Sequence, residues 1–143
     1  MKEFEVGKLG KTMIIELERG ELLIESICAF LEKKGVQNAV VVSAVGSLQK
    51  LVYHRPTDFG EAANDEILEI KQPMEICSLI GAVIGGQAHF HVHASGPEEH
   101  HGGHLELGTE VMYLLEIMLV EIEDCNLERK LTPENVKKLF IKQ

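Results

Sequence analysis

Few cysteines, a shortage of basic residues and no long hydrophobic run characterise this 143-residue sequence. The three cysteines are odd in number, lie far apart and sit among apolar neighbours, so they do not form a disulfide framework. They predict a reducing compartment and small buried thiols. These residues are Cys28, Cys77 and Cys125.

No segment is apolar for long enough to predict a membrane helix. The two longest apolar stretches, Ile76–Ile84 and Val111–Val120, are well short of the ~20 residues that a membrane span needs. The N-terminal segment lacks the apolar run and small-residue cleavage site of a secretory signal. We therefore expect a cytoplasmic protein without a membrane partner.

Basic residues are outnumbered by acidic ones, 14 to 23, which gives a formal net charge of -9. Neutralisation of phosphates by Lys and Arg supplies most non-specific affinity for nucleic acids. The longest basic runs are pairs, such as Lys33-Lys34 and Lys137-Lys138. The composition therefore argues against direct binding to DNA.

What the sequence does contain is enough apolar surface for one core. With 45% hydrophobic and 26% charged residues, the composition is that of a folded globular protein. A chain of this length forms one ordinary domain. We expect a single domain over residues 1–143.

Two segments predict helices. From Glu21 to Lys34 the apolar positions recur with a period of 3.6 residues, and Gly35 follows at the usual C′ position. Near the C-terminus, Thr132-Pro133-Glu134 provides an N-cap, a proline at the first helical position and an early acid. This pattern predicts a short helix that ends at about Phe140.

Most of the remaining chain predicts strands. Residues 38–53 indicate a strand pair or a bulged strand, interrupted at Gly46-Ser47. Pro73 is expected to separate two strands, and Gly85-Gly86 to turn the chain into a strand over Gln87–Ala94. A polar loop over 95–103 and a long strand within 105–123 follow. The prediction is an α+β fold with a mixed, mostly antiparallel sheet, one main helix and a short C-terminal helix.

Six of the seven histidines lie between residues 89 and 104, which is the strongest functional signal. In a strand, alternate side chains share a face, so His89, His91 and His93 project together while Phe90 and Val92 face the core. The remaining members of the group are His100, His101 and His104.

Spacing limits which of these histidines bind one ion. Strand residues two apart lie roughly 6.5–7 Å apart at Cα, which two imidazoles can close onto one metal, whereas His89 and His93 lie about 13 Å apart. One of the three on the strand is therefore outside the site. Gly102-Gly103 permits a tight return of the backbone that presents His104 as a third ligand. Spacing leaves open whether His89 or His93 completes the site.

Three neutral imidazoles predict a divalent transition metal, zinc first, with iron, nickel and copper as alternatives. Three protein ligands leave a position for water, substrate or a residue of another subunit. Zinc lowers the pKa of bound water to about 7, which allows an enzyme hypothesis of the hydrolase or lyase type. Nearby acids would then carry protons or orient the imidazoles. The candidates are Glu98, Glu99 and Glu106.

The sequence resembles a known family at this same place. The run His91-Val92-His93-Ala94 followed by Gly102-Gly103-His104-Leu105 is similar to the HxHA and GGHL signature of the PPC domain, found alone in bacteria and archaea and beside AT-hooks in plants. The segments Val41–Leu51 and Met74–Val83 resemble two further family segments, and the likeness covers about residues 10–125.

The resemblance implies an α/β fold with a mostly antiparallel sheet, a homotrimer, and metal ligands at His91, His93 and His104, with His89 as an additional or alternative ligand. It also carries a DNA-binding label, but the chain has no Arg-Gly-Arg-Pro element of the AT-hook type. We expect first a trimeric metal-binding domain with an assembly, regulatory or interaction role. The alternatives are a zinc-dependent enzyme of unknown substrate and a DNA-binding protein by family analogy alone. The sequence does not identify a protein partner or small molecule.

Overall fold

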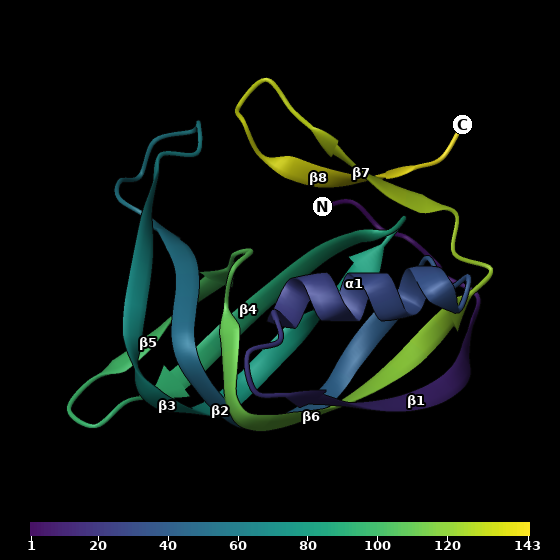
Figure 1. Ribbon diagram of the computed structural model, residues 1–143. Coiled ribbons are helices and arrows are strands. Elements are labelled where there is room, and N and C mark those ends of the chain that lie inside the picture. Colours follow the sequence, from purple (N-terminus) through teal and green to yellow (C-terminus); the bar gives the residue numbers. More distant parts are fainter.

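One strongly curled antiparallel sheet forms most of the structure, a computed structural model that describes residues 1–143 (Figure 1). Its six strands lie in the order β1-β6-β2-β3-β4-β5, and β5 also pairs with β2. A separate hairpin, β7–β8, follows at the C-terminus. The elements are β1 (Lys8–Glu18), α1 (Leu23–Lys33), β2 (Ala39–Pro56), β3 (Asp65–Ile84), β4 (Gln87–Ser95), β5 (His100–Leu105), β6 (Glu110–Glu123), β7 (Leu127–Leu131) and β8 (Lys137–Ile141).

The α+β prediction is wrong, because the fold is β-rich, with 62% of the residues in strands and 8% in a helix. All the strand pairs are antiparallel, so the sheet is not mixed. The predicted C-terminal helix is replaced by a turn and β8. In this turn the N–H of Asn135 donates to the carbonyl of Thr132 at 2.9 Å, and Asn135 has a φ of 59°. Pro133 suits a helix start and the second position of a turn equally well, because its φ is the same in both.

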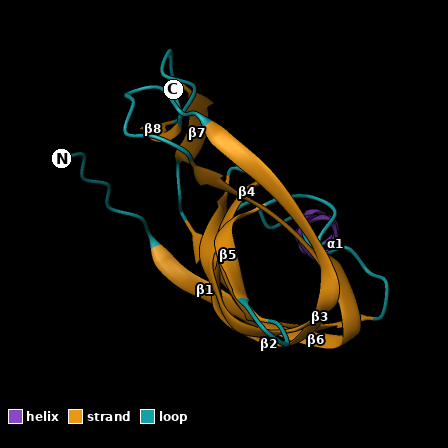
Figure 2. Ribbon diagram, turned by 90° about the vertical axis from the view of Figure 1, so that its left-hand side faces the viewer, coloured by secondary structure: helices purple, strands orange, loops and turns teal.

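The predicted main helix is confirmed as α1. Leu23, Ile27 and Leu31 lie on one side of it and are almost completely buried. Lys33 is in the last turn, and Gly35 follows with a φ of 70°, a conformation that a residue with a Cβ rarely adopts. Figure 2 shows α1 beside the open ring that the curled sheet forms. The helix thus covers the concave side of the sheet, where the core lies.

Two predicted strand interruptions are bulges within continuous strands. β2 runs through Gly46-Ser47 with shifts of register, as the bulged alternative required. β3 also runs through Pro73, where a separation of two strands was predicted. The register passes from Lys50 opposite Lys71 to Leu48 opposite Met74, so Gln49 faces two residues, one of which is Pro73. A bulge leaves a residue out of the hydrogen-bond ladder, and proline has no N–H to contribute to it.

The convex face of the sheet, opposite α1, exposes several apolar side chains. Ile14 is 67% exposed and Ile80 is 63% exposed. Their neighbours pack toward the core, Met13 and Ile15 partly buried and Leu79 buried. We call this set the outer apolar band. Its members are Ile14 of β1, Leu114 of β6, Val42 and Val45 of β2, and Ile80 of β3.

Two smaller observations complete the fold. All three cysteines are free, but Cys77 is exposed, so the prediction of a buried thiol is wrong there. Cys28 is half-buried, and this burial raises the pKa of its thiol, with the charge of Glu25 adding to the effect. The 11-residue α1 is too short to cross a membrane, and the structure has no helix that could do so.

Candidate metal centre

The strand β4 carries His89, His91 and His93 on the convex face of the sheet. Phe90, Val92 and Ala94 alternate with them and are buried in the core, as the sequence pattern predicts. The next strand, β5, pairs with β4 so that His104 lies directly opposite His91. The predicted polar loop over 95–103 is thus shorter than expected, because β5 begins at His100.

The glycines before His104 let β5 approach two other strands closely. A Cβ built on Gly102 would lie 2.6 Å from the carbonyl oxygen of Val92. One on Gly103 would lie 2.5 Å from the carbonyl oxygen of His54. Real Cβ atoms do not come this close to backbone oxygens, so a larger residue would push β5 away from β4 or β2. The Gly-Gly pair therefore places His104 between these two strands.

Three histidines come together on this face. The ligand nitrogens of His89, His91 and His104 all lie within 4.8 Å of one another. The ring centroid of His104 is 4.8 Å from that of His89 and 5.4 Å from that of His91. A small movement of these rings would bring the three nitrogens within ~2.0–2.1 Å of one ion.

The structure places His93 away from this group. Its ring stacks on His100 with a centroid distance of 5.3 Å, and the residue opposite it on β5 is Gly102. The ligand trio implied by the family resemblance therefore has two members, His91 and His104, in the group that the structure gathers. The third histidine of the gathered group is His89, the alternative that spacing left open.

A further histidine, His54 of β2, was missed in the sequence because it stands alone, far from the others. It lies opposite His104 across the β2–β5 pair, and the two rings stack at 4.3 Å. Its Nδ1 lies 2.5 Å from Oε1 of Glu106. A carboxylate only accepts hydrogen bonds, so Nδ1–H of His54 donates to Glu106. In the sequence, the only signal available was the place of His54 directly after the short apolar run Leu51–Tyr53.

His54, His104 and Glu106 form a second group of candidate ligands, also with their ligand atoms within 4.8 Å. Glu106 is held in place because its N–H donates to the carbonyl of Val52 at 2.9 Å. The buried hydroxyl of Thr109 also bonds to the Val52 backbone. His104 belongs to both groups. One nitrogen of His104 can therefore bind a metal in only one of the two groups at a time.

The surroundings favour neutral imidazoles. Burial lowers the pKa of His104 to about 4, and the neighbouring His54 and His89 contribute to this effect. Burial also lowers the pKa of His89, with the charge of Arg129 adding to it. A metal binds the deprotonated ring, so these two histidines are in the ligating form at neutral pH. The donor set and its protonation therefore fit a divalent transition metal.

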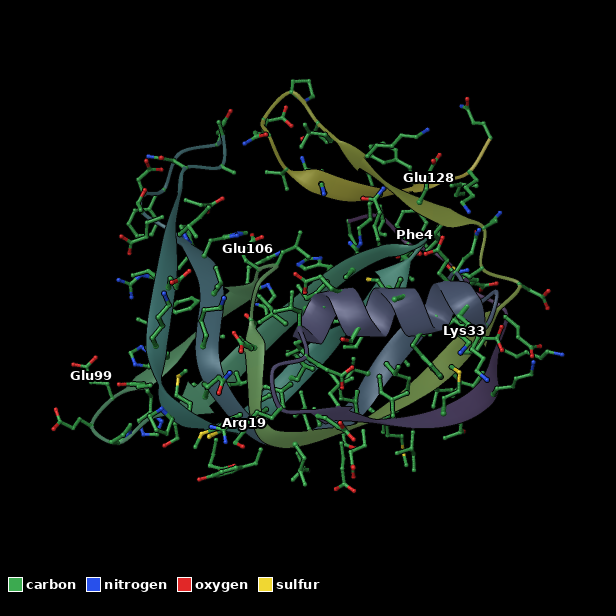
Figure 3. All side chains as sticks on the ribbon, in the orientation of Figure 1. Phe4, Arg19, Lys33, Glu99, Glu106 and Glu128 are labelled. Atoms are coloured by element: carbon green, nitrogen blue, oxygen red, sulfur yellow. The ribbon has the colours of Figure 1, made fainter.

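The other predicted residues lie apart from the centre. His101 forms a hydrogen bond with Gln72, with 3.0 Å between the two Nε2 atoms. Glu98 and Glu99 are exposed in the loop between β4 and β5. Figure 3 shows Glu99 on this projecting loop, well apart from Glu106. Of the three predicted acids, only Glu106 contacts the histidine group.

Comparison with known proteins identifies the family of the chain. The model of the Plants and Prokaryotes Conserved (PCC) domain, the domain named PPC above, matches residues 4–123. The chain therefore belongs to this family. No curated protein matches the chain.

Several solved structures share the fold. A metal-containing protein from Archaeoglobus fulgidus is 27% identical, with a TM-score of 0.84 and coverage of 99% of this chain and 100% of that one. A plant- and prokaryote-conserved protein from Pyrococcus horikoshii is 26% identical, with a TM-score of 0.81 and coverage of 96% and 95%. A Bacteroides thetaiotaomicron protein, named as a candidate DNA-binding protein, is 17% identical, with a TM-score of 0.76 and 96% coverage of both chains. At that identity the last comparison concerns the fold alone.

Proposed function

We propose that this protein is a homotrimeric metal-binding PPC domain that holds one divalent transition metal, most naturally zinc, per chain. The observation that carries the proposal is the convergence of nitrogens from His89, His91 and His104 within 4.8 Å. The similar protein from Archaeoglobus fulgidus is named as metal-containing, which supports the same conclusion. His91 and His104 are the central ligands, with His89 as the third and His93 as its competitor.

Metal analysis of protein purified without an affinity tag tests this proposal. We expect about one transition metal per chain, identified by mass spectrometry, and near-complete loss in a His91→Ala variant. His91 is a ligand in both possible trios, the one with His89 and the one with His93. The expected loss of metal in His91→Ala is therefore the same for both. His101→Ala is the matched control, because this residue bonds to Gln72 instead. Equal metal content in wild type and His91→Ala would overturn the proposal.

The trimer is supported by the outer apolar band. Soluble monomers seldom expose contiguous apolar patches of large size, and such patches mark interaction sites. The band crosses four strands in the order β1-β6-β2-β3, next to the strand that carries the histidines. A subunit packed on it would lie beside the metal centre.

Sedimentation measurements test the trimer. We expect a mass three times the 15.9 kDa of the chain. Replacing Val42 with Glu should dissociate it, because a charge would be buried at the interface without a partner. Leu131→Glu is the control, because Leu131 is a similarly exposed apolar residue of the β7–β8 hairpin. A monomeric wild type, or equal dissociation by both variants, would contradict the trimer.

We propose an assembly or regulatory role for this trimer, with enzymatic activity as the second candidate. The observation that favours an enzyme is the solvent access of the site: His91 is exposed, and a cavity reaches His89 and His91. When bound, a zinc ion would supply an electrophile there. Cobalt-substituted protein separates the two roles, since an open coordination position changes its visible spectrum when a small ligand is added. A spectrum that no small ligand alters would favour the structural role.

Direct binding to DNA is not part of the proposal. The net charge of -9 per chain repels phosphate, and a trimer multiplies this repulsion. Affinity for duplex DNA that falls steeply with salt concentration would restore that candidate.

A further inference from the structure

A cavity of about 560 Å³ opens beside the histidine group on the convex face of the sheet. His89 and His91 form one part of its wall, and β2 and β3 contribute apolar surface through Val40, Ile80 and Ala82. Only one charged side chain lines it, that of Arg129. The cavity therefore combines metal-ligating nitrogens, an aliphatic wall and one guanidinium.

Arg129 comes from β7, in the C-terminal hairpin that lies beyond the matched family region of residues 4–123. Leu127, on the same side of β7, is almost completely buried, so this side faces the main sheet. Glu128 points the other way and pairs with Lys130 at 2.7 Å. Figure 3 labels Glu128 on this hairpin, and Figure 1 shows β7 passing above the turn from β3 into β4. The hairpin thus supplies a cation to a site that the family sheet builds.

The guanidinium of Arg129 has no partner within the chain. Its Nε is buried and forms no hydrogen bond, and none of the ion pairs of the structure involves Arg129. Burial lowers the pKa of Arg129, which reflects the cost of keeping this charge away from water. A buried Nε–H without an acceptor is unfavourable, and an anion bound to the guanidinium would supply that acceptor.

The guanidinium of Arg129 also faces the histidine group, because Arg129, His89 and His91 line the same cavity. A divalent cation on these histidines would add a second positive centre to the same cavity. Two cations that face one cavity repel each other, and an anion placed between them removes the repulsion. Guanidinium groups bind carboxylates with two parallel hydrogen bonds, which gives them geometric preference as well as charge.

The geometry points to a binding site for a small carboxylate with an aliphatic body, held by Arg129 at the carboxylate and by Val40 and Ala82 at the body. This inference rests on the proposed metal function, in that the metal on His89, His91 and His104 is the second positive centre. The apolar wall selects an aliphatic carboxylate over inorganic phosphate, which has no apolar part and carries more charge to desolvate.

Nuclear magnetic resonance of ¹⁵N-labelled protein tests the inference with butyrate as the probe. The Nε–H signal of Arg129, identified by its loss in Arg129→Gln, is followed during titration of the metal-free and the zinc-loaded protein. We expect a saturable shift in both forms, with tighter binding when zinc is present. Acetate should bind about threefold to tenfold more weakly than butyrate, because it lacks two methylene groups.

Two variants of β7 test the role of Arg129: Arg129→Gln removes its charge, and the control Lys130→Gln removes the adjacent charge on the opposite side of the strand. For Arg129→Gln, followed through backbone amide signals of β3 and β4, butyrate affinity should fall by roughly tenfold to a hundredfold, the loss expected for a charge-assisted hydrogen bond. Lys130→Gln has the same change in net charge and should keep its affinity within about twofold. Zinc content should be equal in both variants.

The outcomes separate this inference from the metal function. Binding of butyrate through Arg129 in protein that takes up no metal would uphold the carboxylate site and refute the metal proposal. The carboxylate site is overturned if neither form shows a saturable shift, if both variants lose affinity equally, or if phosphate binds more tightly than butyrate. It is also overturned if Arg129→Gln dissociates the trimer and butyrate does not bind, since a carboxylate of a neighbouring copy would then occupy Arg129.

Discussion

Two groups of histidines lie along one face of β4 and differ in their partners. His89 and His91 meet His104, which in turn stacks on His54, whereas His93 meets only His100. The residue opposite on β5 makes the difference. His91 faces His104, but His93 faces Gly102, which has no side chain. Alternation along a strand fixes the face of each side chain, and the register with the next strand decides which rings converge.

Removal of His104 should have the largest effect on metal affinity. His104 belongs to both candidate ligand groups, so His104→Ala should lower metal affinity by more than about 100-fold, beyond the 10- to 100-fold cost of outer-shell changes. Competition with a chromogenic chelator measures this affinity. Unchanged affinity would refute both groups at once.

The pair of variants His89→Ala and His93→Ala compares the two ends of β4 directly. We expect His89→Ala to weaken metal binding by about 100-fold, at least the cost of losing an outer-shell partner, and His93→Ala by less than about threefold, because only His89 is near His104. The same chelator competition applies, with circular dichroism to verify that both variants fold. The reverse order would establish His91, His93 and His104 as the ligands, as the family resemblance implies.

A variant of Glu106 distinguishes the two candidate ligand groups, because Glu106 belongs only to the group with His54. Glu106→Gln removes the carboxylate that accepts from His54, and we expect metal affinity to fall by about tenfold or less through loss of orientation. Titration of Glu106→Gln with the metal should give the same number of metal ions bound per chain as in the wild type. A loss as large as that in His104→Ala would instead locate the metal on His54, His104 and Glu106.

The smallest effect concerns acid stability without metal. Because burial lowers the pKa of His104 to about 4, the unfolded chain binds a proton at this residue between about pH 6.5 and 4 that the folded chain does not. Folding stability contributed by this group is therefore lost as the pH falls through that range. The Tm of metal-free protein should drop by a few degrees, about 2–5 °C, more than in His104→Ala between pH 7 and 5. Parallel curves for the two proteins would contradict this pKa.

The sequence predicted elements well where one local pattern had one meaning. The 3.6-residue period and Gly35 located α1, and Gly85-Gly86 located the turn into β4. Prediction failed where a local signal had two meanings. Pro133 suited a helix start and a hairpin turn, and Pro73 did not distinguish a bulge in β3 from the end of a strand. Tertiary pairing decided each case.

The candidate site was likewise predictable from the sequence only in part. The face and the importance of His91 and His104 followed from alternation and from the Gly-Gly pair. His54 and Arg129 could not be predicted, because β2 and the C-terminal hairpin reach the site only through pairings between distant segments. The choice between His89 and His93 depended on the orientation of His104, which the spacing in sequence does not contain.

The contact between β2 and β5 is only two residue pairs long, Tyr53 with Leu105 and His54 with His104. This short seam closes the ring of strands, and it must separate whenever β5 moves away from β2. A cation bound to His91 and His104 would join β4 to β5 at the same position. Metal release and separation of the seam would then be coupled, so the lifetime of the loaded protein would follow the opening rate of these few residues and not the unfolding rate of the whole sheet.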